Sequence, residues 1–292
     1  MTISEAERIK RSFYRIEQPT EDDIFLFTEA MEFLINEKHD PNDMLDLGGY
    51  YYGAENFRLA QKYYEMAAEY KLPDAYICLG YIFYYGRTGE PDYEKAFHYY
   101  SLGKESGSIT AAYKLADMYK NGYAVEKDPA KYKEIIEELY PKAARVQYLS
   151  EPLPEIYTRL ARIRTEEGET EEAEDLYWKA KDFLAQRISY DAFFGNLSIM
   201  KGLIRDLYQL TEFDEDDFDL FDLYYLLRSP VTVRFRYNGQ PYEIRAEEED
   251  GEFSIFFNGR YFRDCDGFFS KAEIGGKYLV SINGELYDFE VI

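Results

Sequence analysis

The chain has 292 residues, of which 46 % are hydrophobic, and it carries 57 acidic against 34 basic residues for a net charge of −23. This length suffices for two domains or one elongated array. So acidic a chain repels nucleic acid and anionic membranes, which disfavours nucleic acid as a direct ligand and favours a basic protein partner. A role of the acidity in solubility alone is equally compatible with the composition.

Sequence signals for a membrane, a metal or catalysis are missing. No stretch has the length and apolarity of a membrane helix, and the first residues lack the apolar core of a signal peptide. Cys78 and Cys265 are far apart, as are His39 and His98, and no nucleophile elbow or phosphate-binding loop is present. We therefore predict a cytoplasmic protein that is not an enzyme, with no catalytic residue, metal or cofactor.

The N-terminal region 3–37 predicts two helices that open the array. The second begins after Thr20, which is typical of an N-cap, and Asp23 supplies an acidic residue in its first turn.

The strongest feature of the sequence is an internal repeat. The segment LGYIFYYG at 79–86 recurs as LADMYKNG at 115–122, an offset of 36 residues, and a loop and a second helical segment follow each copy. An earlier copy begins LGGYYYG at 47–53. Its second helix keeps the offset of 36, whereas its first helix is offset by only 32. The copy at 79 therefore has four extra residues between its helices.

The copies at 79 and 115 resemble Sel-one-like repeats, which are helical hairpins related to the tetratricopeptide repeat. The copy at 47 lacks the extra residues and resembles a plain tetratricopeptide repeat, as does LARIRTEEGETEEAEDLYWKA at 160–180. The resemblance implies four hairpins at 43–73, 74–109, 110–146 and 152–187. Tyr132 departs from the family pattern, because the family has a small residue at this position.

The hairpin pattern also predicts how the helices pack. Gly80 and Ala96 lack bulk where the two helices of the second hairpin would cross, and Tyr93 and Tyr100 share the helix face of Ala96. We therefore expect both tyrosines in the core.

The resemblance further implies a binding groove, because the first helix of each tetratricopeptide hairpin lines a concave surface. The corresponding residues are Tyr52 in the first hairpin, Tyr81, Tyr84 and Tyr85 in the second, Tyr113, Asp117, Lys120 and Asn121 in the third, and Arg162 in the fourth. Such a tyrosine-rich groove suits an extended or helical peptide. The alternative is that these rings only fill the inner wall of a tightly wound array, and the sequence leaves both possibilities open.

Residues 190–228 predict a final pair of helices that cap the array. The second helix would cover DEDDFDLFDLYYLLRS at 214–229, whose acidic start suits a helix N-terminus. This segment has no central glycine and its acidic residues do not alternate as calcium ligands do, which disfavours a calcium loop. Its expected buried face consists of Phe218, Phe221, Leu223, Tyr225 and Leu226.

From residue 230 the hydrophobic pattern alternates with a period of two, which is typical of strands. Turn signals at Asn238–Gly239, Asp250–Gly251, Asn258–Gly259 and Asn283–Gly284 separate the expected strands, among them KYLVSI at 277–282. A short helix at 266–274 would cover the sheet with Phe268, Phe269 and Ala272 facing inward. We predict five or six antiparallel strands at 230–292 and recognise no family for them.

These observations predict a mostly α fold: a right-handed α-α superhelix of helical hairpins at 1–229, followed by a small antiparallel β-rich domain with one short helix at 230–292. The predicted function is a non-enzymatic scaffold or adaptor that binds a basic peptide or protein segment in the concave groove. One alternative is an acidic inhibitor or immunity-type protein that blocks a basic active site. A further alternative is an enzyme with its site at the seam of the β domain.

Overall fold

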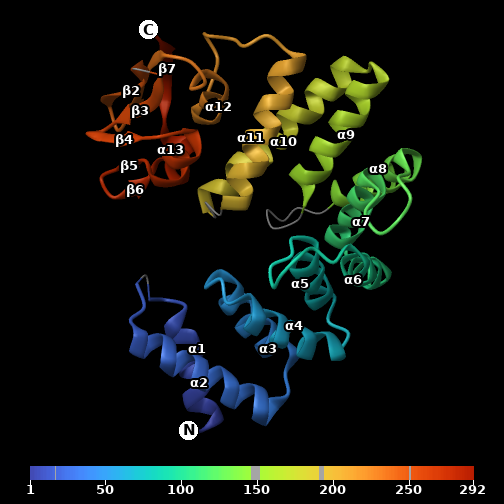
Figure 1. Ribbon diagram of the computed structural model, residues 1–292. Coiled ribbons are helices and arrows are strands. Elements are labelled where there is room, and N and C mark those ends of the chain that lie inside the picture. The colour runs from blue at the N-terminus through green and yellow to red at the C-terminus, as the bar shows by residue number, and fades with distance from the viewer. Residues whose placement is uncertain (17, 146–151, 191–193, 250) are drawn as a thin grey trace. The chain divides into compact units, whose positions relative to one another are not determined.

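The computed structural model describes residues 1–16, 18–145, 152–190, 194–249 and 251–292 (Figure 1). The chain divides into two compact units, Met1–Ile135 and Ile136–Ile292. The first unit contains helices, and the second contains helices followed by strands. The boundary expected after residue 229 stays a prediction about independent folding.

The first unit is a series of helical hairpins. Its helices are α1 (Ile3–Phe13), α2 (Glu21–Lys38), α3 (Pro41–Gly53), α4 (Phe57–Glu69), α5 (Pro73–Tyr84), α6 (Tyr93–Glu105), α7 (Ile109–Asn121) and the start of α8 (Pro129–Ala143). Thr20 caps α2 as expected, because its hydroxyl accepts a hydrogen bond from the amide of Asp23 and the Asp23 carboxylate accepts one from the amide of Thr20. The hairpins expected at 43–73 and 74–109 correspond to α3–α4 and α5–α6. The hairpin expected at 110–146 covers α7 and α8, its pairing stays a prediction because the two units divide within α8, and residue 146 lies outside the described part.

In each of two hairpins, a glycine of the first helix faces a tyrosine ring of the second helix. A Cβ atom on Gly80 of α5 would come too close to the ring of Tyr100 of α6, about 2.8 Å from its Cζ atom, and one on Gly48 of α3 would lie 2.6 Å from the ring of Tyr64 of α4. Both rings are buried, so the missing side chain allows the paired helices to approach. The expected core position of Tyr100 is confirmed.

Tyr93 differs from the expectation because it is only partly buried. Its ring stacks on Tyr123, which follows the next hairpin's first helix, with centroids 4.2 Å apart. The ring therefore packs between hairpins at the edge of the core. Tyr132 is 4 % exposed, so a large buried ring replaces the small residue of the family pattern.

The second unit begins with the end of α8 and continues through α9 (Leu153–Glu167), α10 (Thr170–Tyr190) and α11 (Phe194–Leu210). The hairpin expected at 152–187 is formed by α9 and α10. Of the helical pair expected at 190–228, residues 191–193 lie outside the described part, and α11 is the first member.

The second member is shorter than expected. Residues 214–219 are not helical, and a 3-10 turn, η1 (Leu220–Asp222), leads into α12 (Leu223–Leu226). Asp219 explains the late start: its carboxylate accepts a hydrogen bond from the amide of Phe221, which makes it an N-cap rather than an interior residue. Of the expected buried face, Phe218, Phe221 and Leu223 are buried, while Tyr225 and Leu226 are half-buried.

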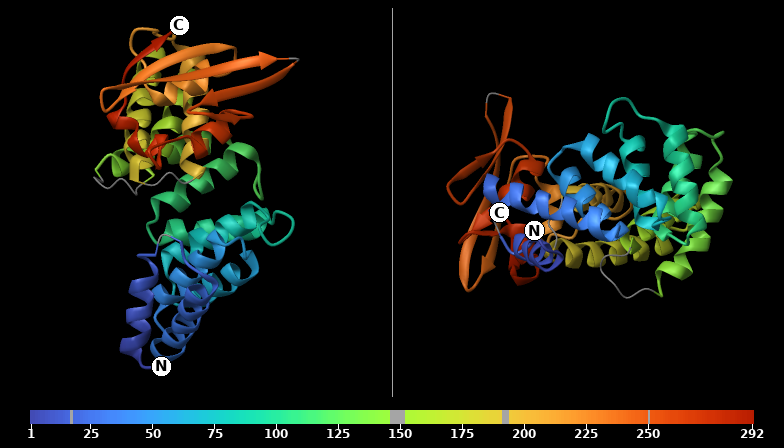
Figure 2. Two further views of the ribbon diagram at one scale, coloured as in Figure 1. Left: turned by 90° about the vertical axis from the view of Figure 1, so that its left-hand side faces the viewer. Right: turned by 90° about the horizontal axis from the view of Figure 1, so that it is seen from below.

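The C-terminal sheet is antiparallel, as expected (Figure 2). Its strands are β1 (Val231–Tyr237), β2 (Gln240–Glu249), β3 (Glu252–Phe257), β4 (Arg260–Phe262) and β7 (Tyr287–Val291), in the order β4-β3-β2-β1-β7. A separate pair consists of β5 (Glu273–Ile274) and β6 (Lys277–Tyr278). The turns Asn238–Gly239 and Asn258–Gly259 both have positive φ at their two residues, as tight hairpins require. Asp250 of a third expected turn lies outside the described residues.

The short helix α13 (Cys265–Lys271) confirms the expected covering helix, with Phe268, Phe269 and Ala272 buried. The strand expected at 277–282 is mostly wrong, because only Lys277–Tyr278 pairs and Leu279–Glu285 forms a 3-10 helix, η2. Asn283 accounts for this difference, since its Nδ2 atom donates to the carbonyl of Ala185 in α10. This segment therefore anchors the β region to the helices of the same unit. The expected fold class, helical hairpin repeats followed by a small antiparallel β region with one short helix, is confirmed.

Candidate partner-binding site

Three of the expected groove residues, Tyr81, Tyr84 and Tyr85, lie at the C-terminal end of α5. The rings of Tyr81 and Tyr85 stack, with centroids 6.1 Å apart and planes inclined by 13°. Tyr85 is 48 % exposed, whereas the ring of Tyr81 makes a T-shaped contact with the buried ring of Tyr100. The pair is therefore an aromatic surface that the core supports from behind.

Tyr84 has a different environment. Its ring contacts Tyr93, Tyr100 and Tyr123, with centroid distances of 5.6, 6.4 and 5.9 Å. Burial, and then the charge of Asp117, raise the pKa of Tyr84 to about 12. Of the three tyrosines, Tyr84 is thus mainly a packing residue.

The third hairpin contributes a cation that sequence reasoning missed. Tyr113, an expected groove residue, is 4 % exposed and therefore buried. The next residue, Lys114, places its Nζ atom 5.0 Å from the ring centroid of Tyr81 and 5.8 Å from that of Tyr85. No sequence signal could have found it, because its repeat equivalent, Cys78, is packed inside the hairpin.

The other expected residues of the third and fourth hairpins lie in separate surroundings. Lys120 places its Nζ atom 4.8 Å from the ring centroid of Tyr132, and Asn121 is exposed. Arg162 belongs to the second unit, where its Nε atom donates to Asp206 Oδ2 at 2.7 Å. Its immediate role is therefore an ion pair between α9 and α11.

Arg87, in the loop between α5 and α6, is a second residue that sequence reasoning missed. Its Nε atom donates to the hydroxyl of Tyr52 at 3.2 Å. Its guanidinium carbon lies 5.8 Å from the ring centroid of Tyr52 and 5.3 Å from the centroids of Phe57 and Tyr85. The expected groove residue Tyr52 is thus joined to Tyr85 through Arg87.

The loop holds Arg87 in place. Its amide donates to the carbonyl of Ile82 at 2.9 Å, and Gly86 before it has a φ of +59°. A Cβ atom on Gly86 would lie 2.6 Å from the backbone nitrogen of Pro91, so only glycine fits. The four extra residues of this hairpin, visible in the sequence, lengthen the loop between α5 and α6 that carries Arg87.

The next hairpin repeats this arrangement with a different residue. Tyr123 follows Gly122 as Arg87 follows Gly86, and it contacts the rings of Tyr84 and Tyr93. By the repeat offsets of 32 and 36, Tyr84 and Tyr93 are equivalent to Tyr52 and Phe57. In both hairpins the residue after the positive-φ glycine therefore packs back on the preceding hairpin. We call Tyr52, Tyr81, Tyr85, Arg87 and Lys114 the Tyr85 site.

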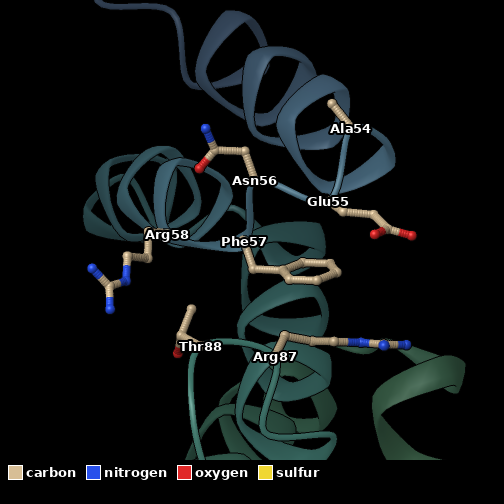
Figure 3. Close-up of a pocket in the computed structure, with 7 residues that line it drawn as sticks. All are labelled: Ala54, Glu55, Asn56, Phe57, Arg58, Arg87 and Thr88. Carbon is tan, nitrogen blue, oxygen red and sulfur yellow. The ribbon is translucent and has the colours of Figure 1, made fainter.

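An open hollow of about 490 Å³ lies beside the Tyr85 site (Figure 3). It is lined by Ala54, Glu55, Asn56, Phe57, Arg58, Arg87 and Thr88. Arg87 extends along the ring of Phe57, and Arg58 points to the opposite side. Thr88 donates to the side-chain oxygen of Gln61 at 3.1 Å, which ties this wall to α4.

Metal binding would need several His, Cys, Asp or Glu side chains close together within the described ranges. There, no group of three or more His, Cys, Asp or Glu residues is arranged to hold a metal ion. Burial raises the pKa of Cys78 to about 12 and that of Cys265 to about 11, so neither thiol supplies a thiolate at neutral pH. Among the helices of the described ranges, none has the length and apolarity to cross a membrane.

Comparison with known proteins assigns the repeats. Residues 41–69, 73–108 and 109–131 match the model of the Sel1 repeat family. The matched residues include the first hairpin, which the sequence analysis interpreted as a plain tetratricopeptide repeat. The hairpin of α9 and α10 lies outside the matched residues, and no family model matches the β region.

Two further proteins are similar to this chain in sequence or in fold. An uncharacterized protein of Neisseria meningitidis serogroup B is 36 % identical over 118 residues, which are 39 % of this chain and 25 % of that protein. The chain thus matches only about a quarter of the length of this curated relative. A Sel1 repeat protein from Oxalobacter formigenes has a similar fold, with a TM-score of 0.55 and 20 % identity over 77 % of this chain and 84 % of that one. This likeness concerns the fold alone.

Proposed function

We propose that this protein is a non-enzymatic scaffold that holds a segment of a protein partner, and that the Tyr85 site is the contact surface. Sel1 repeat proteins commonly mediate protein–protein interactions, which supports the general class. The observation that carries the proposal is the stacked pair of Tyr81 and Tyr85, whose outer ring is 48 % exposed while the inner one rests on the core. Rigid aromatic rings of this kind are enriched at the centres of protein interfaces.

The charge of the chain supports the basic partner expected from the sequence. The second unit holds 33 acidic and 18 basic residues, and the first holds 24 and 16, so most of the excess acid lies in the second unit. Long-range attraction of this kind accelerates encounter more than it strengthens the final contact. In this proposal the acidic field attracts the partner and the Tyr85 site holds one of its segments.

The test is affinity capture from a lysate of the source cells with quantitative mass spectrometry. Tyr85→Ala is compared with Tyr70→Ala, which removes a ring of the same first unit that is 49 % exposed. We expect Tyr85→Ala to reduce capture of a specific protein at least about tenfold, as loss of an aromatic anchor does, and Tyr70→Ala to leave it unchanged. Circular dichroism checks that both variants fold.

Two outcomes would contradict the proposal. Equal capture by the wild type and Tyr85→Ala would place the contact elsewhere, as the inhibitor alternative expects. Equal losses in both variants would indicate a general effect of removing surface tyrosines rather than a specific site.

A further inference from the structure

Arg87 and its repeat equivalent, Tyr123, differ in chemistry at the same position of the loop. Tyr123 completes a cluster of rings by stacking on Tyr93 with planes inclined by 9°. Arg87 occupies the same loop position and lies against Tyr52 and Phe57, but it adds a charge and several N–H donors. Tyrosine at this position is sufficient for packing, as Tyr123 shows. The charge of Arg87 therefore needs a separate explanation.

Arg87 has no acidic partner within the described part of the chain, although the protein has 57 acidic residues. Other half-buried arginines are paired: Arg164 contacts Glu137, Glu167, Glu169 and Glu172, and Arg162 contacts Asp206. The hydrogen bond that Arg87 makes, from Nε to Tyr52, leaves its two terminal nitrogens for a further acceptor. The three rings around it limit its rotamers before any partner arrives, which reduces the entropy lost on binding.

Lys114 brings a second cation to the same ring. The Arg87 guanidinium carbon lies 5.3 Å, and the Lys114 Nζ atom 5.8 Å, from the ring centroid of Tyr85. Glu55, in the wall of the hollow, and Asp117, on α7 beside Tyr84, are two acidic side chains of the same region. Two cations at one exposed aromatic ring suit a carboxylate that is followed or preceded by an apolar residue.

We infer that the Tyr85 site recognises an Asp or Glu side chain of the partner segment, with Arg87 as the main receptor of the carboxylate and Lys114 as the second cation. A neighbouring apolar or aromatic residue of that segment then covers the rings of Tyr81 and Tyr85. This inference rests on the proposed function and specifies its chemistry. It is compatible with a partner of net positive charge, because the field of the whole chain acts during encounter and Arg87 acts at contact.

The experiment is a selection of random short peptides displayed on phage against the immobilised full-length chain. Three forms are used: the wild type, Arg87→Tyr and Arg87→Lys. Arg87→Tyr is the decisive variant, because tyrosine is the residue of the equivalent position in the next hairpin. Its thermal midpoint should equal that of the wild type. Should it fail to fold, Arg87→Gln removes the charge while it retains a long polar side chain.

We expect the wild type to enrich peptides with Asp or Glu next to an aromatic or branched apolar residue, and Arg87→Tyr to lose this enrichment. A synthetic copy of the most enriched peptide should bind the wild type at least about tenfold more tightly than Arg87→Tyr, since a hydrogen bond to a charged group is lost. Arg87→Lys should lie between the two, because lysine keeps the charge but not the paired geometry.

The inference is overturned by enrichment of Lys or Arg peptides on the wild type, or by equal affinity of the selected acidic peptide for the wild type and Arg87→Tyr. If selected peptides depend on Tyr85 but not on Arg87, the proposed function stands and this inference fails. If no sequence is enriched on the wild type, both fail.

Discussion

Lys181 of α10 places its Nζ atom 2.6 Å from Oδ2 of Asp222, and both groups are closed to solvent, with side chains 5 % and 0 % exposed. The second carboxylate oxygen of Asp222 accepts a hydrogen bond from the hydroxyl of Tyr208 at 2.9 Å. Because these residues belong to α10, α11 and η1, the network attaches the 3-10 turn before α12 to two long helices.

We expect Lys181→Ala to destabilise the second unit by about 3–5 kcal/mol, because it leaves the Asp222 carboxylate buried without its cation. Lys179→Ala is the matched control, since Lys179 pairs with Asp175 on the exposed face of the same helix. An exposed pair of this kind contributes less than about 1 kcal/mol. The midpoint of guanidinium unfolding, followed by circular dichroism, measures both effects. Similar midpoints for the two variants would show that the buried pair has no special role.

Two helical glycines, Gly80 in α5 and Gly49 in α3, should respond to alanine in opposite ways. Gly80→Ala would press a methyl group against the buried ring of Tyr100, which should cost about 1–3 kcal/mol as other overpacked cores do. Gly49→Ala meets no atom within 4 Å and lies inside α3, so it should stabilise the protein by about 0.5–1 kcal/mol. Urea unfolding of both variants distinguishes packing from helix propensity. Unchanged or increased stability of Gly80→Ala would contradict the close approach of α5 and α6 at Gly80, and a loss of stability in Gly49→Ala would contradict the effect of helix propensity in α3.

The helical hairpins could be predicted because their signals are local and repeated. Gly80, Ala96 and Tyr100 recur at fixed offsets, and each position has one physical meaning: a close approach of two helices or the ring that fills it. The start of the helix within 214–229 could not be predicted in this way. The apolar residues of this segment suit a helix throughout, whereas Asp219, in the middle of the segment, acts as a cap. A capping residue inside an apolar pattern does not reveal where the helix begins.

The candidate site could be predicted only in part, for a related reason. The expected tyrosines 81 and 85 do lie together at the surface, but the cations beside them come from positions that the repeat pattern does not distinguish. Arg87 lies in a loop between α5 and α6. The repeat offsets in the sequence predict the length of this loop but not the course of its backbone. Its contact with Tyr52 spans 35 residues, so it depends on how one hairpin packs on the next.

The ionisation of Tyr84 should weaken folding at alkaline pH. Burial and the nearby charge of Asp117 raise its pKa to about 12, above the ordinary value near 10. Between these values the unfolded chain loses the phenol proton and the folded chain keeps it, so stability falls as pH rises through this range. In Tyr84→Phe the drop in the guanidinium midpoint between pH 8 and pH 11 should be smaller than in the wild type. An identical drop would mean that Tyr84 ionises in the folded protein without penalty.

Removal of residues 230–292 should destabilise the helices of the second unit, because the β region supplies part of their core. The ring of Phe269 in α13 stacks on Tyr224 of α12 at 3.8 Å between centroids, and the two residues are 1 % and 2 % exposed. A chain that ends at Ser229 would expose Tyr224 and should bind the dye ANS and lose near-ultraviolet circular dichroism. In the full chain, Phe269→Ala should cost about 3–5 kcal/mol, and Phe256→Ala, on the half-exposed face of β3, clearly less. A truncated chain that keeps the unfolding midpoint of the intact second unit would instead establish residues 1–229 and 230–292 as independent domains.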